Sequence, residues 1–344
     1  MKIKPEGVRI FLAATLSFAF MFSVTMTVHE ACAADSKKTE FAEAKYTFAH
    51  HLVAGQAGDV YARDFAKLVN EMTNGKVTIE VFDSNQLGNQ RENTEALRFG
   101  TLDFSVTDLP TLGTIIPKMS VVSLPYLFDS LAHAEKFYKS EESAKLDQEV
   151  FDTVGIKFLG HSHVGYRVVV GHKALNTPDD LKNLKIATPN KPINVDTMKA
   201  FGANPTVVPY GETYTALQTS IVDACDLTLD SVYLARLHEV AKTISLTHHI
   251  YVDLCLAVSK QTFQSMSPKL QNVIIKASEI ATERNHLLLA NVYEDAKQNL
   301  LKDSAQLISP DPELFRQTAQ SVWEQFFKTA PEGRALVDYI RNLK

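Results

Sequence analysis

Short extended segments alternate with helical segments along this chain, and this alternation constrains the fold more than any other feature. Residues 46–48 and 77–81 alternate apolar with polar side chains, as half-buried strands do. Residues 61–72 and 90–99 place apolar side chains three and four positions apart, which marks one face of a helix. A series of strand, helix, strand and helix builds a mostly parallel sheet covered on both faces. The pattern therefore predicts an α/β fold.

The same rhythm starts again after about residue 155. Residues 166–170 are rich in β-forming side chains, and 184–186 form a second short strand pattern. Thr177-Pro178 is typical of a helix start with proline in the first turn, and residues 194–201 have helical spacing up to Gly202. Two α/β units follow from this. Because no Pro/Gly-rich or low-complexity linker separates them, we expect ordered segments to carry the chain across.

One segment near the C-terminus has the pattern of an unusually long helix. After Pro268 neither Pro nor Gly occurs until beyond residue 305, and the apolar residues keep to a stripe. At 1.5 Å per residue such a helix is ~55 Å long, which exceeds one small unit. We expect one helix that spans both units. Two helices broken near Asn285 are the alternative.

The first 34 residues have the pattern of an export signal. Three basic residues lie within the first nine positions, residues 10–28 are almost wholly apolar, and small residues occupy 31–34. We expect removal after about residue 34 and a mature protein in the periplasm. An uncleaved membrane anchor and a lipid attached at Cys32 are the alternatives.

Composition and motifs exclude several classes of function. The formal net charge of -5 is opposite to what a nucleic-acid-binding surface needs. No G-x-S-x-G, phosphate-loop, G-x-G-x-x-G or H-E-x-x-H motif occurs, so we expect no enzyme and no cofactor. Two histidine pairs, His161 with His163 and His248 with His249, lack a recognised metal-ligand spacing, and we expect no metal there.

The two cysteines that follow the signal are Cys225 and Cys255. Two cysteines in a chain of this size do not make a disulfide framework, even in an oxidising compartment. We expect two buried free thiols, with a disulfide as the alternative.

Arg167 lies inside the apolar, β-rich segment 164–170. A buried guanidinium needs an anionic partner, and its planar fork suits a carboxylate. That carboxylate is either an internal Asp or Glu or belongs to a ligand.

Several longer motifs resemble one known family. They are Gly-Lys-Val-Thr-Ile-Glu-Val-Phe at 75–82 with Gln-Leu-Gly at 86–88, Glu-Ala-Leu-Arg-Phe-Gly-Thr-Leu-Asp at 95–103, Leu-Pro-Tyr-Leu-Phe at 124–128, and the segment 201–219 around Asn204-Pro205. The chain resembles the solute-binding proteins of tripartite ATP-independent periplasmic (TRAP) transporters, of the C4-dicarboxylate-binding (DctP) type. The resemblance covers nearly all of the mature chain.

The resemblance implies a two-lobed periplasmic-binding-protein fold, type II-like, with a long helix spanning both lobes. The expected lobes are 35–164 plus about 253–290, and 165–252 plus about 291–344, with the bridging helix at about 268–305. Such a protein performs no chemistry. It closes on one small solute and delivers it to the small and large subunits of a membrane permease driven by an ion gradient. We expect a monomer.

The resemblance also implies pocket residues. The family's dominant carboxylate-clamping arginine, in a K-I-R-x-P segment, is replaced here by Ala187, and an amide position is replaced by Leu227. Eight residues match ligand-binding positions: Arg167, Tyr210, Asp226, His249, Glu92, Asn190, His50 and Asp108.

Two ligand hypotheses follow. A small organic acid is held by Arg167, aided by Lys191, with Tyr210 against its carbon skeleton. Alternatively, without the clamp, the remaining carboxylates suit a neutral polyol or a small amine such as an amino alcohol. A sensor module for a signalling receptor and a secreted hydrolase are the alternative classes of function.

Overall fold

The computed structural model describes residues 41–343, and Glu43–Lys344 form one compact unit. The export signal expected at residues 1–34 lies outside the described residues, as does Cys32. Within residues 41–343, no helix combines the length and apolar character that crossing a membrane requires.

The first group of strands contains the two strands expected near residues 46 and 77. β1 (Ala44–Ala49) lies parallel to β2 (Val77–Phe82) and to β3 (Phe104–Thr107), and β3 lies antiparallel to β9 (Tyr251–Ser259). The connecting helices are α2 (Ala57–Met72) and α3 (Gln90–Arg98). Both helices agree with the predicted spacing, and α2 buries the apolar face that was predicted from it.

A single long strand carries the chain from this group to the next. β4 (Ile156–Gly171) pairs antiparallel with β9 up to Tyr166, with bulges after Phe158 and His163. From Arg167 onward it pairs with β7 (Ala224–Thr228) and β8 (Thr243–Ser245). An ordered segment thus connects the two groups, as the absence of a linker predicted.

The second group of strands repeats the architecture of the first. The strand order of the main sheet is β2-β1-β3-β9-β4-β7-β5-β6, and β8 pairs with β4 and β10 at its side. The remaining elements are β5 (Lys185–Thr188), β6 (Asn204–Val207), β10 (Gln306–Ile308), α6 (Pro192–Ala200), α7 (Thr213–Gln218) and α8 (Leu229–Leu234). β5 runs parallel to both of its neighbours, β6 and β7.

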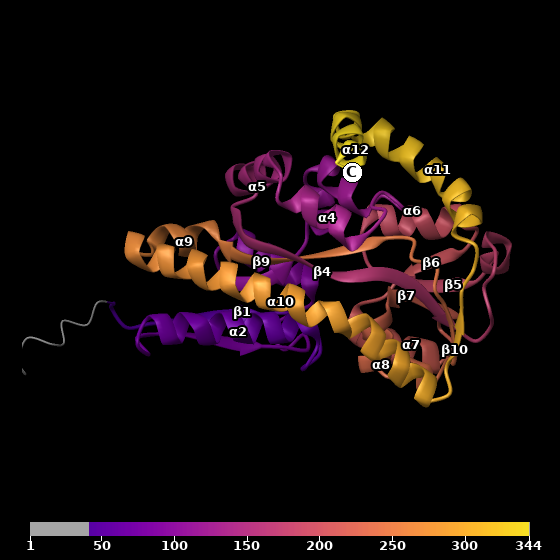
Figure 1. The fold of residues 1–344 in the computed structure, drawn as a ribbon, viewed down its shortest axis with the longest axis horizontal. Helices are drawn as coiled ribbons and strands as arrows, with labels where there is room; N and C mark the ends of the chain where they lie inside the picture. The colour runs from indigo at the N-terminus through magenta and orange to yellow at the C-terminus, as the bar shows by residue number, and fades with distance from the viewer. Residues whose placement is uncertain (1–40, 344) are drawn as a thin grey trace, which may run out of the picture. The chain divides into compact units, whose positions relative to one another are not determined.

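The predicted long helix is one unbroken element, α10 (Pro268–Lys302). Ser267 caps its first turn by accepting a hydrogen bond from the Leu270 N–H. α10 packs against α2 of the first group and against α8 of the second (Figure 1). The helix does not break at Asn285, because that side chain is buried and bonded to Ser162 and to the Ala57 carbonyl.

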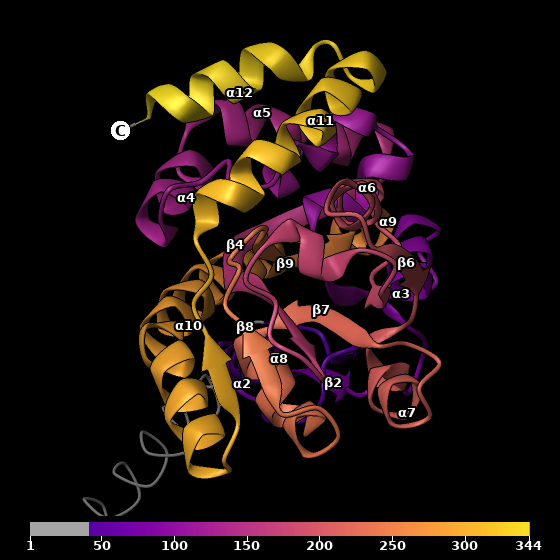
Figure 2. The ribbon, with the colours of Figure 1, turned by 90° about the vertical axis from the view of Figure 1, so that its right-hand side faces the viewer.

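The remaining helices cover the sheet. They are α4 (Leu131–Tyr138), α5 (Glu141–Thr153), α9 (Lys260–Ser265), α11 (Pro312–Thr329) and α12 (Gly333–Asn342). α11 packs on α6 (Figure 2), and α12 packs on the short 3₁₀ segment η2 (Pro117–Ser123). The C-terminal helices thereby contact elements that follow β3 and elements that follow β5.

Two local expectations have clear outcomes. The helix expected to begin at Thr177-Pro178 is wrong, because only one 3₁₀ turn forms, η3 (Pro178–Leu181). The chain turns away at Asn183, whose φ of 67° is left-handed. Cys225 and Cys255 are buried and free, as expected.

Candidate functional site

A cavity of about 250 Å³ lies where segments of the two strand groups meet. Its apolar wall includes Leu52, Val164, Val208 and Leu254. Its charged groups come from widely separated positions in the sequence: Arg91, Asp108, Arg167, Lys191, Asp226 and Asp253. An apolar cavity with a few convergent polar groups is the usual form of a small-molecule site.

Arg167 is paired with a carboxylate of the protein itself. Its Nε donates to Asp226 Oδ1 at 2.6 Å, and Nη2 donates to the Asp226 carbonyl oxygen. Asp226 also accepts hydrogen bonds from His249 Nε2 at 3.1 Å and Thr188 Oγ1 at 2.9 Å. Burial alone would raise the pKa of Asp226, but Arg167 and His249 hold it well below its usual value. Of the two partners predicted for Arg167, the internal carboxylate is therefore present.

A second buried ion pair joins Lys191 to Asp108. Lys191 immediately precedes α6, whereas Asp108 caps the 3₁₀ segment η1 (Leu109–Thr114) that follows β3. Asp108 also accepts hydrogen bonds from Gln90 Nε2 at 2.7 Å and from the Thr111 N–H at 2.8 Å. Burial opposes ionisation of Asp108, but Lys191 and the Thr111 donors lower its pKa below the usual value.

A third carboxyl group, Asp253 on β9, lines the same cavity and is 2% exposed. Its Oδ2 accepts a hydrogen bond from the Leu109 N–H at 3.1 Å. Burial and the neighbouring Asp108 carboxylate raise the pKa of Asp253 to about 7. The cavity thus contains a carboxyl group that titrates near neutral pH.

Five of the eight residues predicted from the family resemblance line the cavity: Arg167, Tyr210, Asp226, Asn190 and Asp108. The Tyr210 hydroxyl donates to the Ser231 carbonyl at 3.4 Å, which orients the ring along the cavity wall. Lys191, expected as an aid to Arg167, also lines it. Contact of each residue with a ligand remains a prediction.

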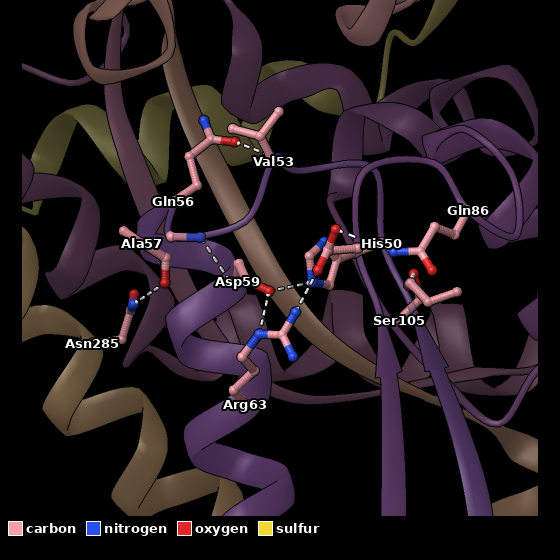
Figure 3. Close-up of polar contacts among 12 residues, drawn as sticks. His50, Val53, Gln56, Ala57, Asp59, Arg63, Gln86, Ser105 and Asn285 are labelled. Atoms are coloured by element: carbon pink, nitrogen blue, oxygen red, sulfur yellow. Dashed lines mark hydrogen bonds and ion pairs between the residues drawn. The ribbon is translucent and has the colours of Figure 1, made fainter. Parts of the chain in front are cut away.

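The other three do not line the cavity. His50 is fully buried and bonded to Asp59 at 3.1 Å, and Asp59 also binds Arg63 (Figure 3). Burial lowers the pKa of His50 despite this carboxylate. Glu92 turns back to cap α3, where it accepts the Asn89 N–H at 2.8 Å.

His249 acts behind the cavity rather than in it. Its Nε2 contacts Asp226 and its Nδ1 lies 2.8 Å from Thr247 Oγ1, so both ring nitrogens are used inside the protein. His50, Glu92 and His249 are thus bonded to other protein groups outside the cavity lining, and contact of each with a ligand remains a prediction.

The family resemblance did not indicate several polar lining residues, among them His51, Gln90, Arg91 and Asp253. Gln90 and Arg91 lie in the first turn of α3 beside Glu92. The resemblance therefore indicated the correct helix, but Gln90 and Arg91 line the cavity in place of Glu92. Asp253 is a lone acid in the apolar strand 251–258. That is the pattern that singled out Arg167, and it could have identified Asp253.

Three of the four histidines considered for metal binding, His161, His248 and His249, are hydrogen-bonded to other side chains. His161 Nε2 lies 2.9 Å from Asp147 Oδ2, and its Nδ1 lies 3.1 Å from Cys255 Sγ. His248 Nε2 lies 3.1 Å from the Tyr293 hydroxyl. Residues 41–343 contain no cluster of three or more His, Cys, Asp or Glu side chains suited to a metal ion.

Comparison with known proteins identifies the family. Residues 48–330 match the model of the DctP family, described as bacterial extracellular solute-binding protein, family 7. The 2,3-diketo-L-gulonate-binding periplasmic protein YiaO of Escherichia coli K12 is 29% identical over 325 residues, covering 94% of this chain and 99% of YiaO. This chain therefore belongs to family 7 of the bacterial extracellular solute-binding proteins.

Solved structures agree with this assignment. A TRAP periplasmic solute-binding protein from Sulfitobacter sp. NAS-14.1 with bound β-D-galacturonate has a TM-score of 0.84 and 28% identity, covering 87% of this chain and all of that one. Its counterpart from Haemophilus influenzae with bound L-gulonate has a TM-score of 0.83 and 26% identity, covering 87% and 99%. The fold is the two-lobed α/β fold of TRAP solute-binding proteins, and the function is extracytoplasmic capture of a small solute for a membrane permease.

Proposed function

We propose that this chain captures a small sugar acid in the cavity around Arg167 and Lys191. The observation that carries the proposal is the convergence of two buried ion pairs on one cavity. Each cation spends only part of its donors on its carboxylate, and the remaining N–H groups suit the carboxylate and hydroxyl oxygens of such a solute. The galacturonate and gulonate of the two similar structures belong to this chemical class.

The same proposal includes how capture works. Two lobes, 35–164 plus about 253–290 and 165–252 plus about 291–344, close on the solute while α10 spans both. The Lys191–Asp108 pair, and the Gln56 amide donating to Ser231 Oγ at 2.9 Å, join segments of different lobes. These contacts would favour the closed state, and a solute that touches both lobes would favour it further.

The remaining parts of the proposal concern location and partners. A monomer, exported to the periplasm by residues 1–34, delivers the solute unchanged to the small and large subunits of a TRAP permease. Because it performs no chemistry, a bound sugar acid should be recovered intact after prolonged incubation, which NMR of the released solute can test.

A neutral polyol is the second candidate solute. It is favoured by the pairing of both buried cations with internal carboxylates and by Ala187 in place of the clamping arginine. Such a cavity offers a polyol both donors and acceptors without requiring a compensating charge.

A thermal-shift screen separates the two candidates. The probes are D-galacturonate, L-gulonate and succinate, against sorbitol and ethanolamine. A solute that binds only the folded state raises the melting temperature by mass action. We expect the sugar acids to give the largest shifts, whereas a shift with sorbitol alone would favour the polyol.

The variant Arg167→Lys tests the role of the guanidinium. It keeps the charge that Asp226 needs but removes the planar fork. We expect it to weaken sugar-acid binding at least tenfold, while the control Arg98→Lys, on the exposed end of α3, leaves binding unchanged. Unchanged affinity in Arg167→Lys would contradict a direct contact between Arg167 and the solute.

A further inference from the structure

Asp253 has one carboxyl oxygen that the protein does not use. Oδ2 accepts hydrogen bonds from the Leu109 N–H at 3.1 Å and from Cys255 Sγ at 3.8 Å, but no described residue donates a hydrogen bond to Oδ1. The residue lines the cavity and is almost completely buried. A buried polar atom at a cavity without a protein partner is a position where a ligand atom can bind.

The charges around Asp253 do not balance when it is ionised. Asp108 and Asp253 are two carboxyl groups beside one ammonium group, Lys191, and Lys191 is already paired with Asp108. The other titratable groups that face Asp253 are His161 from β4, Cys255 and Tyr251 from β9, and Tyr138 from α4. His161 is itself paired with Asp147. One proton on the two carboxyl groups would leave this part of the cavity neutral.

We propose that Asp253 is a specificity-determining residue that is protonated in the complex and donates a hydrogen bond from Oδ1 to the solute carboxylate. This inference rests on the proposed function. The proton comes from solvent and binds to Oδ1, the carboxyl oxygen that has no protein donor, in a residue that lines the cavity. An ionised Asp253 would instead repel the acid.

The electrostatics of the free protein support this assignment. Burial and Asp108 raise the pKa of Asp253 to about 7, so the free group is protonated below neutral pH and ionised above it. This pKa sets the direction in which acid binding depends on pH. Below pH 7 the donor is already in place, and above pH 7 binding of an acid requires uptake of a proton. A sugar carboxylate has an ordinary pKa and stays ionised throughout this range.

The test is calorimetric titration with D-galacturonate between pH 6 and 8.5. For the wild type we expect an affinity that is constant at the acid end and falls about tenfold per pH unit at the alkaline end. At pH 8, titrations in buffers of different ionisation enthalpy should show uptake of close to one proton per solute bound. Sorbitol, which has no charge, should show no uptake.

The variant Asp253→Asn supplies a permanent donor of nearly the same shape and cannot titrate. We expect it to bind D-galacturonate with affinity that changes less than twofold across the pH range and with no proton uptake. The control Asp223→Asn, which removes a carboxylate outside the cavity, should keep the wild-type pH profile.

Two outcomes would overturn the inference. Wild-type affinity that is independent of pH contradicts it, and so does an unchanged pH profile in Asp253→Asn. A profile that disappears in His161→Gln but persists in Asp253→Asn would assign the proton to His161 instead. In each case the acid still binds, so the proposed function stands, whereas failure of every acid probe to bind at any pH would contradict the proposed function itself.

Discussion

The cavity contains two buried ion pairs that differ in how they are held. Arg167 and Asp226 lie on neighbouring strands, β4 and β7, and both oxygens of Asp226 are occupied by Arg167, His249 and Thr188. Lys191 and Asp108 lie on segments 83 residues apart in the chain, and Asp253 shares their surroundings. The first pair is a fixed part of one sheet. The second pair joins two distant segments of the chain, and a bound solute can change the protonation of its neighbour Asp253.

The largest expected effect is on stability, at the first pair. Asp226→Ala leaves Arg167 buried without a counter-charge and removes the partner of His249 and Thr188. Breaking a buried pair in this way typically destabilises a protein by about 3–5 kcal/mol. Denaturant unfolding of the variant measures the loss, with Asp179→Ala, an exposed member of an ion pair with Lys182, as the matched control expected to change little.

A loss of stability below about 1 kcal/mol for Asp226→Ala would contradict the difference between the two pairs. It would mean that water or another carboxylate reaches Arg167 readily, so that the first pair is no more fixed than the second.

At the second pair we expect a substitution to reduce solute affinity more than the free energy of unfolding. Lys191→Met removes the ammonium, but Asp108 keeps its Gln90 and Thr111 donors and can share a proton with Asp253. The stability loss should therefore be smaller than for Asp226→Ala, roughly 1–2 kcal/mol. Affinity for D-galacturonate should fall at least tenfold in calorimetric titration. The opposite order, with Lys191→Met the less stable variant, would reverse the roles assigned to the two pairs.

The strands and helices that frame this cavity follow from periodicity. The alternation at 77–81 and the helical spacing at 61–72 predicted β2 and α2, and the absence of Pro and Gly after Pro268 predicted α10. The 3₁₀ turn at Pro178 was not predicted, because the capping pattern of Thr177 and Asp180 is shared by a single turn and a full helix. What separates them is the left-handed turn at Asn183, which sequence alone indicates only weakly.

The sequence predicted a buried charged site, but it did not predict which residues pair with one another there. Arg167 in an apolar strand predicted a buried anionic partner, yet only the folded register of β4 and β7 identifies Asp226 as that partner. Similarly, Glu92 matched a pocket position of the family, but in the folded protein its carboxylate caps α3 by accepting the Asn89 N–H. Family likeness indicates the element, and local hydrogen bonding decides which of its residues lines the cavity.

The smallest expected effect tests whether affinity is set by the cavity charges and not by the residues around them. Glu92 and Arg91 are neighbours in the first turn of α3, but Glu92 caps the helix whereas Arg91 lines the cavity, and no ion pair joins the Arg91 guanidinium to another described residue. Glu92→Ala should lower stability by about 0.5–1 kcal/mol through loss of the cap and change D-galacturonate affinity less than twofold. Arg91→Ala should leave stability unchanged and weaken binding severalfold, because it removes a cation from the cavity lining. Suppose instead that Glu92→Ala weakened binding more than Arg91→Ala. Glu92 would then contact the solute in a closed state, and the cavity would contain a fourth carboxylate beside Asp108, Asp226 and Asp253.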